Sequence, residues 1–320
     1  MKHLSERDER ILACAQLNAE LSAAEIARLS RIAEPQVRNC LGRLMDAGIA
    51  HKLWYINPYA LGRTLYNLWF TVRASKSRER SRLEAYVRAS PSVVFFVELA
   101  GRFLYSATIQ TRSLAELALF LEELSNKFGA CFTEKSIATV LELQDLPIVK
   151  RWRLPQARQS IAIGVDSTVA SIDSTSQAIL DQLASNPRLS LNQISRALGL
   201  PYSTVSYRFS QLRKEGVITG CRYFIDFLKL GYSFSYHQLT LAGASRGELR
   251  ALFDFLVKHP AVYYYERCLG TWDLEVGTIT KLHSDQAKFI RNLSDNHGSS
   301  LARSESSFVT RFLKLNQVSI

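Results

Sequence analysis

Apolar residues recur at helical spacing near the start of the chain and again in its middle third. Each place predicts three short amphipathic helices, over 4–18, 23–29 and 34–47 and then over 172–184, 191–198 and 201–214. Gly48 and Gly216 end the third helix of each set. An extended segment rich in aliphatic and aromatic residues follows each glycine, as a wing strand or strand pair. This order is typical of a winged helix-turn-helix.

Beyond each set of helices the pattern changes to strands interrupted by two helices. The first half predicts strands at 65–73, 93–99, 103–110 and 131–143, with helices at 77–89 and 114–128. The second half predicts strands at 233–241, 262–268, 274–280 and a last one ending near 315, with helices at 245–258 and 284–295. The order β-α-β-β-α-β is that of the ferredoxin-like split motif. The expected fold class is therefore α+β.

The two halves of the chain repeat one another. A shift of 168 residues places Ile11 on Ile179 without a gap, and a shift of 169 farther on places Gly101 on Gly270. The other matches are also core apolar positions and turn glycines, which are the positions that a shared fold requires. Each half is therefore expected to form one structural unit, and the two units should look alike.

The repeat divides the chain into five expected segments. They are a winged helix-turn-helix over 1–60, a ferredoxin-like domain over 61–145, a linker over 146–171, a second winged helix-turn-helix over 172–229 and a second ferredoxin-like domain over 230–320. The linker contains Pro147 and Pro155, a basic run and a later Ser/Thr-rich piece. The basic run Lys150, Arg151 and Arg153 suits DNA phosphates, but a solvated linker explains it at least as well.

Composition narrows the class of partner. The formal net charge is +11 and 47% of the residues are hydrophobic, so the chain can bury real cores while remaining basic. A basic chain favours a polyanionic partner, with nucleic acid first and an acidic membrane surface second, although a merely basic soluble protein has the same charge. No apolar run approaches the ~18–20 residues of a membrane helix. The N-terminus is too charged for a signal peptide, so a cytoplasmic protein is expected.

Metal or nucleophilic chemistry finds no support in the spacing of reactive residues. The cysteines are far apart and form no CxxC pair: Cys14, Cys40, Cys131, Cys221 and Cys268. We expect reduced, mostly buried thiols, with zinc ligation as the weaker alternative. The six histidines are scattered, and no glycine-rich phosphate loop is present. We therefore expect no metal, no cofactor and no enzyme activity.

A winged helix-turn-helix followed by this α/β order resembles the Lrp/AsnC, or feast/famine, family of transcription regulators. The residues that carry the resemblance are Ile172-Asp173, Ile179-Leu180, the stretch LGLPYSTVSYRFSQLRKEGVITGCRYFID at 198–226, and Gly270-x-x-Asp273. The first half matches more loosely, through Leu4, Asp8, Ile11, Leu12 and the stretch RLMDAGIAHKLWYINPYALG at 43–62.

This resemblance implies a sequence-specific DNA-binding transcriptional regulator with RAM-type ferredoxin-like domains. Its partner would be double-stranded DNA, and a small effector such as an amino acid would modulate it. The family usually carries one unit per chain and dimerises through its α/β domains. Two units in one chain therefore imply an intramolecular pseudo-dimer, and pairing into a homodimer stays open.

Exposed positions of the third helix in each set supply the candidate DNA contacts. Arginine bonds guanine bidentately and asparagine bonds adenine, whereas Lys and Arg on the margins meet phosphates. The candidate residues are Gln36, Arg38, Asn39, Arg43, Lys52, Tyr202, Ser203, Thr204, Ser206, Tyr207, Arg208, Arg213, Lys214 and Arg222. Val205, Phe209 and Leu212 are expected in the core. Because the two recognition helices differ, we predict an asymmetric site with half-sites about one helical turn, ~34 Å, apart.

Candidate effector contacts lie in the turn Gly270, Thr271 and Asp273, which is similar to the family's glycine–aspartate turn. The Asp273 carboxylate would orient the ammonium of an amino acid, whereas the simpler interpretation is a turn-capping aspartate. The first half departs from the family pattern here, with Gly101-Arg102-Phe103-Leu104 in the corresponding place. Arg31 likewise replaces the turn residue Gly199. The first half is therefore expected to have lost effector binding and to read DNA differently.

Two rival functions remain. Siroheme decarboxylases resemble this paired architecture, and conceivable tetrapyrrole-site residues are His237, His283, Tyr265 and Arg267, although no histidine cluster accompanies them. A scaffold of the same fold that binds no DNA is the other rival. The basic residues of the recognition helices argue against the scaffold: Arg38, Arg43, Arg208 and Arg213.

Overall fold

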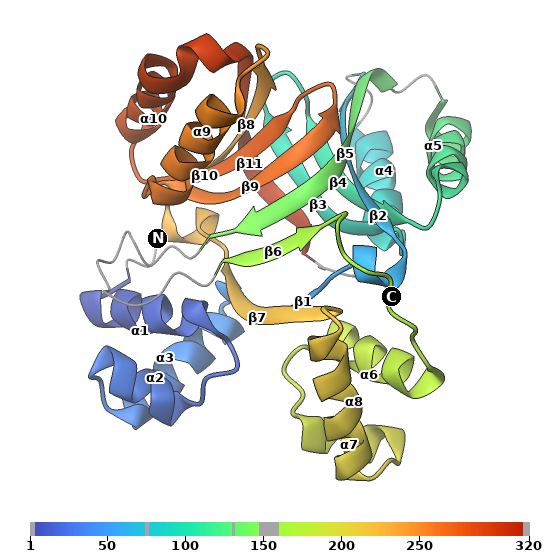
Figure 1. Ribbon diagram of the computed structural model, residues 1–320, viewed down its shortest axis with the longest axis vertical. Helices are drawn as coiled ribbons and strands as arrows, with labels where there is room; N and C mark the ends of the chain where they lie inside the picture. The colour runs from blue at the N-terminus through green and yellow to red at the C-terminus, as the bar shows by residue number, and fades with distance from the viewer. Residues whose placement is uncertain (1–3, 74–76, 130–131, 147–159, 316–320) are drawn as a thin grey trace. The chain divides into compact units, whose positions relative to one another are not determined.

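The computed structural model describes residues 4–73, 77–129, 132–146 and 160–315 (Figure 1). The chain divides into two compact units, each assembled from both halves of the sequence. Unit 1 contains residues 1–52, 143–162 and 221–309, and unit 2 contains residues 53–142, 163–220 and 310–320. Each unit therefore joins the helical headpiece of one half to the α/β domain of the other half.

The headpiece of unit 1 is formed by α1 (Glu6–Leu17), α2 (Ala23–Ser30) and α3 (Glu34–Asp46), followed by β1 (Ala50–Ile56). Ser22 and Glu25 form a capping box that begins α2, as the sequence indicates. The turn after α2 contains Arg31 at φ 55°, the only residue other than glycine in the left-handed region among the described residues. This strained position corresponds to Gly199 in the second half.

The headpiece of unit 2 is formed by α6 (Ser174–Ser185), α7 (Leu191–Leu198) and α8 (Tyr202–Lys214), followed by β7 (Ile218–Ile225). Asp173 caps α6 by accepting a hydrogen bond from the Ser176 N–H at 2.7 Å. Gly199 ends α7 at φ 64°, where glycine carries no steric penalty. The core prediction for α8 is confirmed, because Val205, Phe209 and Leu212 are all buried.

The α/β domain of unit 1 contains β8 (Ser233–Leu241), α9 (Arg246–Lys258), β9 (Val262–Gly270), β10 (Leu274–Thr280), α10 (His283–His297) and the first part of β11 (Leu301–Leu315). Short 3-10 helices precede β8 and β11 at Leu228–Leu230 and Gly298–Ser300. The sheet order is β11-β8-β10-β9, which is the ferredoxin-like order. In Figure 1, α9 and α10 cover one face of this sheet, where Leu252 and Phe289 enter the core with Val276.

The α/β domain of unit 2 repeats this arrangement after a 3-10 turn at Tyr59–Leu61. It contains β2 (Thr64–Val72), α4 (Ser77–Ala89), β3 (Val93–Ala100), β4 (Tyr105–Thr111), α5 (Leu114–Phe128) and most of β5 (Phe132–Asp145). The sheet order is β5-β2-β4-β3. Leu83 and Val87 of α4 and Phe120 of α5 pack on the sheet. The expected α+β fold, with two winged helix-turn-helix regions and two β-α-β-β-α-β domains, is confirmed.

The last strand of each half ends in the unit of the other half. In unit 1 the Leu146 N–H donates to the Tyr263 carbonyl at 2.8 Å, which extends the sheet at β9. In unit 2 the end of β11 lies beside β3, and Arg311 contacts Glu98 and Glu84 at 3.0 and 2.8 Å. The end of β11, from residue 310, is thus part of the first α/β domain.

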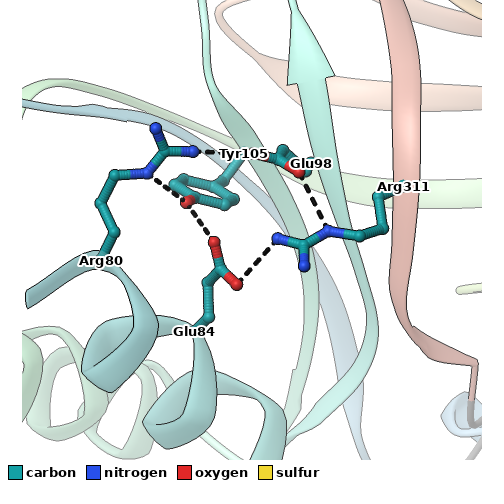
Figure 2. Close-up of polar contacts among 5 residues, drawn as sticks. All are labelled: Arg80, Glu84, Glu98, Tyr105 and Arg311. Carbon is teal, nitrogen blue, oxygen red and sulfur yellow. Dashed lines mark hydrogen bonds and ion pairs between the residues drawn. The ribbon is translucent and has the colours of Figure 1, made fainter. Parts of the chain in front are cut away.

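Figure 2 shows that Arg311 belongs to a closed ring of polar contacts. Arg80 contacts Glu98 at 2.7 Å and the Tyr105 hydroxyl at 3.3 Å, and that hydroxyl donates to Glu84 at 2.7 Å. Burial and the neighbouring Glu84 raise the pKa of Tyr105 to about 12. The ring therefore keeps Tyr105 protonated as a donor while the two arginines neutralise the two glutamates.

The region expected as a linker includes a short strand, β6 (Ile161–Gly164). The side chains of Ile161 and Ile163 are buried, and the Val165 N–H donates to the Leu141 carbonyl at 2.9 Å. Alternating isoleucines explain the strand, because every second side chain faces the protein. The prolines and the basic run Lys150, Arg151 and Arg153 lie outside the described residues.

Each wing contributes one strand, and the two strands form a small sheet of their own. In unit 1 the Asp226 N–H donates to the Ile49 carbonyl at 2.7 Å, and in unit 2 the Asn57 N–H donates to the Val217 carbonyl at 2.8 Å. The alternative of a strand pair inside each wing is therefore wrong.

No helix within the described ranges is long and apolar enough to cross a membrane.

Candidate nucleic-acid interface

Helix α8 presents a polar, largely uncharged face. Tyr202, Ser203 and Tyr207 are exposed, whereas Thr204 and Ser206 are half-buried. Tyr207 is 59% exposed and Tyr202 is 49% exposed, although tyrosine is partly buried in most proteins. The arrangement places hydroxyl groups and two aromatic rings where a winged helix-turn-helix meets the major groove.

The two arginines of α8 contact other parts of unit 2. Arg208 forms an ion pair with Asp173 at 2.7 Å, so it ties α8 to the start of α6. Backbone and side-chain hydrogen bonds with Ser176 lower the pKa of Asp173, and the positive charge of Arg208 adds to this effect. The Arg213 guanidinium lies 4.9 Å from the centre of the Phe209 ring and 6.0 Å from that of Trp54. Lys214 is exposed at the end of the helix.

Helix α3 presents a different face. Gln36, Arg38 and Asn39 are all exposed, opposite the buried Val37 and Leu41. Arg38 forms an ion pair with Glu34 one turn earlier in the helix. An exposed pair of this kind contributes little to stability, so DNA can displace the carboxylate at small cost. Amide and guanidinium groups therefore dominate this recognition surface.

Arg43 lies in the last turn of α3, and its guanidinium contacts the Asp8 carboxylate at 2.8 Å. Burial raises the pKa of Asp8, but hydrogen bonds from Arg43, Cys40 and Ser5 outweigh that effect, and the net pKa is lowered. The Arg43 side chain is about half exposed, so one side of its guanidinium still faces solvent. A phosphate contact by Arg43 is compatible with this geometry.

The wing residues differ from one another in exposure. Lys52 of β1 is half-buried. Arg222 of β7 is only 4% exposed, and it lies 3.4 Å from the Asp145 carboxylate at the end of β5. Its expected phosphate contact is therefore corrected, because a buried and ion-paired guanidinium cannot reach a DNA backbone. No pattern in the sequence predicts this pairing, because Asp145 lies in another domain.

The expected effector turn between β9 and β10 is closely held by backbone contacts. Gly270 has φ 153°, and Thr271 is exposed. The Asp273 carboxylate accepts a hydrogen bond from the Leu241 N–H at 2.7 Å, and the Asp273 N–H donates to the Leu239 carbonyl at 2.9 Å. The geometry thus agrees with a turn-capping aspartate, and an effector would have to share this carboxylate.

The corresponding turn of the first half has different chemistry. Arg102 forms an ion pair with Glu134 of β5, and its guanidinium lies 5.1 Å from the centre of the Phe103 ring. Phe103 itself is buried. Arg102 and Leu104 therefore stand at the positions of Thr271 and Asp273, whereas Phe103 stands at that of Trp272, which is also buried.

The conceivable tetrapyrrole residues do not form an open site. His237 is completely buried, and its two ring nitrogens lie 2.8 Å from the hydroxyls of Ser306 and Thr278. Burial lowers the pKa of His237 to about 3, so it is neutral at physiological pH. Tyr265 stacks on Phe253 within the core, and Arg267 is exposed. The side chain of His283 lies outside the described residues.

The cysteines that the structure describes are free and buried. Cys14, Cys40, Cys221 and Cys268 are buried free thiols, and Cys131 lies outside the described residues. Burial raises the pKa of Cys40 to about 12, which keeps it an unreactive thiol. Among the residues that the structure describes, no group of three His, Cys, Asp or Glu side chains is arranged to hold a metal ion.

Comparison with protein families identifies the helical headpieces. The winged helix-turn-helix DNA-binding family matches residues 4–50 and again residues 172–219. Each match contains the three helices of one headpiece. The expectation of two DNA-binding helix-turn-helix domains in tandem is confirmed.

Individual proteins match either one half or the whole chain. The HTH-type transcriptional regulator FL11 of Pyrococcus furiosus is 25% identical over 148 residues, which are 45% of this chain and 97% of the regulator. An AsnC family transcriptional regulator from Agrobacterium tumefaciens covers 45% of this chain and 94% of its own, at 17% identity and a TM-score of 0.40. Two winged helix-turn-helix matches, and a regulator that spans about half of this chain, confirm the expected resemblance to single-unit transcription regulators and the tandem duplication.

A whole-chain match comes from a different class of protein. The crystal structure of the siroheme decarboxylase NirDL covers 98% of this chain and 94% of its own, with a TM-score of 0.63 and 13% identity. At this identity the likeness shows a shared fold along the whole chain.

Proposed function

We propose that this chain is a sequence-specific DNA-binding transcriptional regulator whose two headpieces bind one DNA site as a pseudo-dimer. The observation that carries the proposal is the pair of winged helix-turn-helix matches at 4–50 and 172–219, each with an exposed polar recognition helix. The net charge of +11 supports it, because phosphate neutralisation supplies most of the affinity of such domains. The names of relatives such as FL11 point to the same role.

In this proposal α3 and α8 each enter a major groove. Base contacts come from the exposed faces of the two helices, at Gln36, Arg38, Asn39, Tyr202, Ser203, Thr204, Ser206 and Tyr207. Phosphate contacts come from Arg43, Lys52 and Lys214. Arg208 and Arg213 serve mainly to hold α8 in place, because both already contact other groups in unit 2. The headpieces need no catalytic group, so we propose no enzyme activity.

An amino acid or similar small effector is proposed for the turn at Gly270, Thr271 and Asp273. The exposed Thr271 and the partly exposed Asp273 support it, although Asp273 already accepts the Leu241 N–H. Thermal unfolding of the wild type and of Asp273→Asn, with each amino acid in turn, tests this part. A rise in Tm that the variant loses supports it, whereas no rise with any amino acid removes it.

The DNA-binding proposal is tested by fluorescence anisotropy with a duplex of mixed sequence at increasing salt. We expect Kd to rise steeply with salt, with a slope that falls by about one for each lost phosphate contact in Lys214→Ala. Lys288→Ala removes an exposed lysine from α10 and is the charge-matched control. No binding at low salt, or equal effects of the two changes, would contradict the proposal.

A second candidate is a tetrapyrrole enzyme, because the whole-chain fold likeness is to the siroheme decarboxylase NirDL. The sealed environment of His237 disfavours it, since neither ring nitrogen is open to a ligand. Absorption in the Soret region after incubation with haem distinguishes the two functions. We expect no bound haem, whereas a saturable Soret band would favour the enzyme.

A further inference from the structure

One face of α8 is built almost entirely of hydroxyl groups and one aromatic ring. Its members follow helical spacing on the side opposite the buried residues, and they are Ser203, Ser206, Tyr207, Ser210 and Lys214. The Ser210 hydroxyl donates to the Ser206 carbonyl at 2.9 Å, so its proton is already used within the helix. The only charge on this face lies at its carboxyl-terminal end.

Tyr207 is the largest exposed group on this face. The residue is 59% exposed, and the Arg208 guanidinium lies 5.8 Å from the ring centre while it pairs with Asp173. That ion pair directs the arginine toward α6. The tyrosine is therefore the largest group that α8 offers to a base edge without the loss of an ion pair.

The corresponding face of α3 has the opposite character. The shift of 168 residues places Pro35, Arg38, Asn39, Gly42 and Asp46 on it. A Cβ atom added at Gly42 would meet no atom within 4 Å, so the surface beside Asn39 is low and open. Arg38 and Asn39 thus project from a flat surface, with donor and acceptor groups that suit purines.

We infer that Tyr207 makes α8 select half-sites with a thymine at the contacted position, through its methyl group, whereas α3 reads the hydrogen-bonding edges of guanine or adenine through Arg38 and Asn39. In the major groove the C5-methyl of thymine is the one apolar feature of the base edges. An exposed aromatic ring with no nearby unengaged cation suits that methyl group. This inference rests on the proposed DNA-binding function and specifies the sequence that it recognises.

The test begins with selection of bound duplexes from a random library by the full-length chain. The site obtained from the wild type is then remade with single thymines replaced by deoxyuridine, which removes only the methyl group. In the α8 half-site we expect one replacement to weaken wild-type binding about fourfold, the factor that corresponds to burying one methyl group, ~0.8 kcal/mol. Tyr207→Ala should bind the thymine and deoxyuridine sites equally, and Tyr207→Phe should keep the difference.

Asn39→Ala is the matched variant in the other headpiece. It should relax the base preference at one position of the α3 half-site and leave the deoxyuridine effect in the α8 half-site unchanged. If the wild type selects a site but no deoxyuridine replacement weakens binding, or Tyr207→Ala keeps the full effect, the inference is wrong while the proposed function stands. If the wild type selects no site from the library, the proposed function fails as well.

Discussion

The indole Nε1 of Trp54 donates a hydrogen bond to the carbonyl of Pro187 at 3.2 Å. Trp54 follows the first headpiece in sequence, yet it contacts the second one within unit 2. The same indole packs edge-on against Phe209 of α8, with ring centres 5.4 Å apart. The second headpiece is thus held by chain from the first half, in agreement with the composition of unit 2.

Replacement of Trp54 should therefore loosen the second headpiece. Trp54→Phe loses one hydrogen bond, which costs about 1 kcal/mol of the free energy of unfolding. Trp54→Ala also removes the ring from the core, which costs about 3–5 kcal/mol. Urea unfolding measures both values, and hydrogen exchange should quicken in α8 before α3. Faster exchange in α3 alone would contradict the exchanged arrangement.

The left-handed backbone of Arg31 predicts that a single substitution to glycine stabilises the protein. A residue with a Cβ atom in the left-handed region costs about 1–2 kcal/mol, and glycine recovers part of this while losing chain entropy. Arg31→Gly should raise the free energy of unfolding by about 0.5–1 kcal/mol, measured by thermal unfolding.

The reciprocal change, Gly199→Arg, should lower the free energy of unfolding by a similar amount, because a Cβ atom there meets nothing within 4 Å and only the backbone is strained. If both changes are destabilising, backbone strain at Arg31 is not the dominant effect.

Burial of His237 predicts a pH dependence of stability. Its pKa is lowered from 6.5 to about 3, so the unfolded chain binds one more proton than the folded chain between these values. Stability is therefore fully present above pH 6.5 and falls as the pH decreases, by about 2 kcal/mol at pH 5 from this group alone. His237→Gln should show a shallower loss when unfolding is measured from pH 7 to pH 4. An unchanged slope would mean that His237 does not contribute to it.

The ring around Arg311 predicts that the last strand stabilises the first α/β domain. Arg311→Ala should lower the free energy of unfolding by about 1 kcal/mol, since the guanidinium is half exposed and solvent screens its pairs with Glu84 and Glu98. Arg311→Lys keeps the charge but cannot contact Glu84 and Glu98 in the same two-sided way. Its free energy of unfolding should therefore lie between those of the wild type and Arg311→Ala. A double-mutant cycle with Glu98→Gln measures the coupling, and a coupling of zero would contradict the role assigned to this contact.

The sequence predicted local elements well because caps and glycines mark them. Helices Ser77–Ala89 and Leu114–Phe128 and strands Ser233–Leu241 and Leu274–Thr280 have the bounds expected from the sequence. Tertiary partners were not predictable in this way. Periodicity shows that a face is buried but not what covers it, so the pairing of Arg222 with Asp145 and the exchange of headpieces between halves were missed. Repeat analysis treats each half as a closed unit, whereas the structure joins the two halves.

The candidate DNA-binding surface was predicted in part. Exposed positions on α3 and α8 follow from helical spacing, because the buried positions are apolar. The engagement of Arg208 by Asp173 was not predictable, because the partner lies on another helix. This ion pair changes which side chain of α8 is available to DNA.

The most direct measurement of the central claim is selection of genomic DNA fragments bound by the full-length chain, followed by sequencing. The account predicts an enriched site with two dissimilar half-sites about one helical turn apart, ~34 Å, bound by one chain. Arg38→Ala combined with Asn39→Ala should relax one half-site, and Tyr207→Ala should relax the other. Absence of any enriched sequence, or a single half-site that neither variant alters, would contradict it.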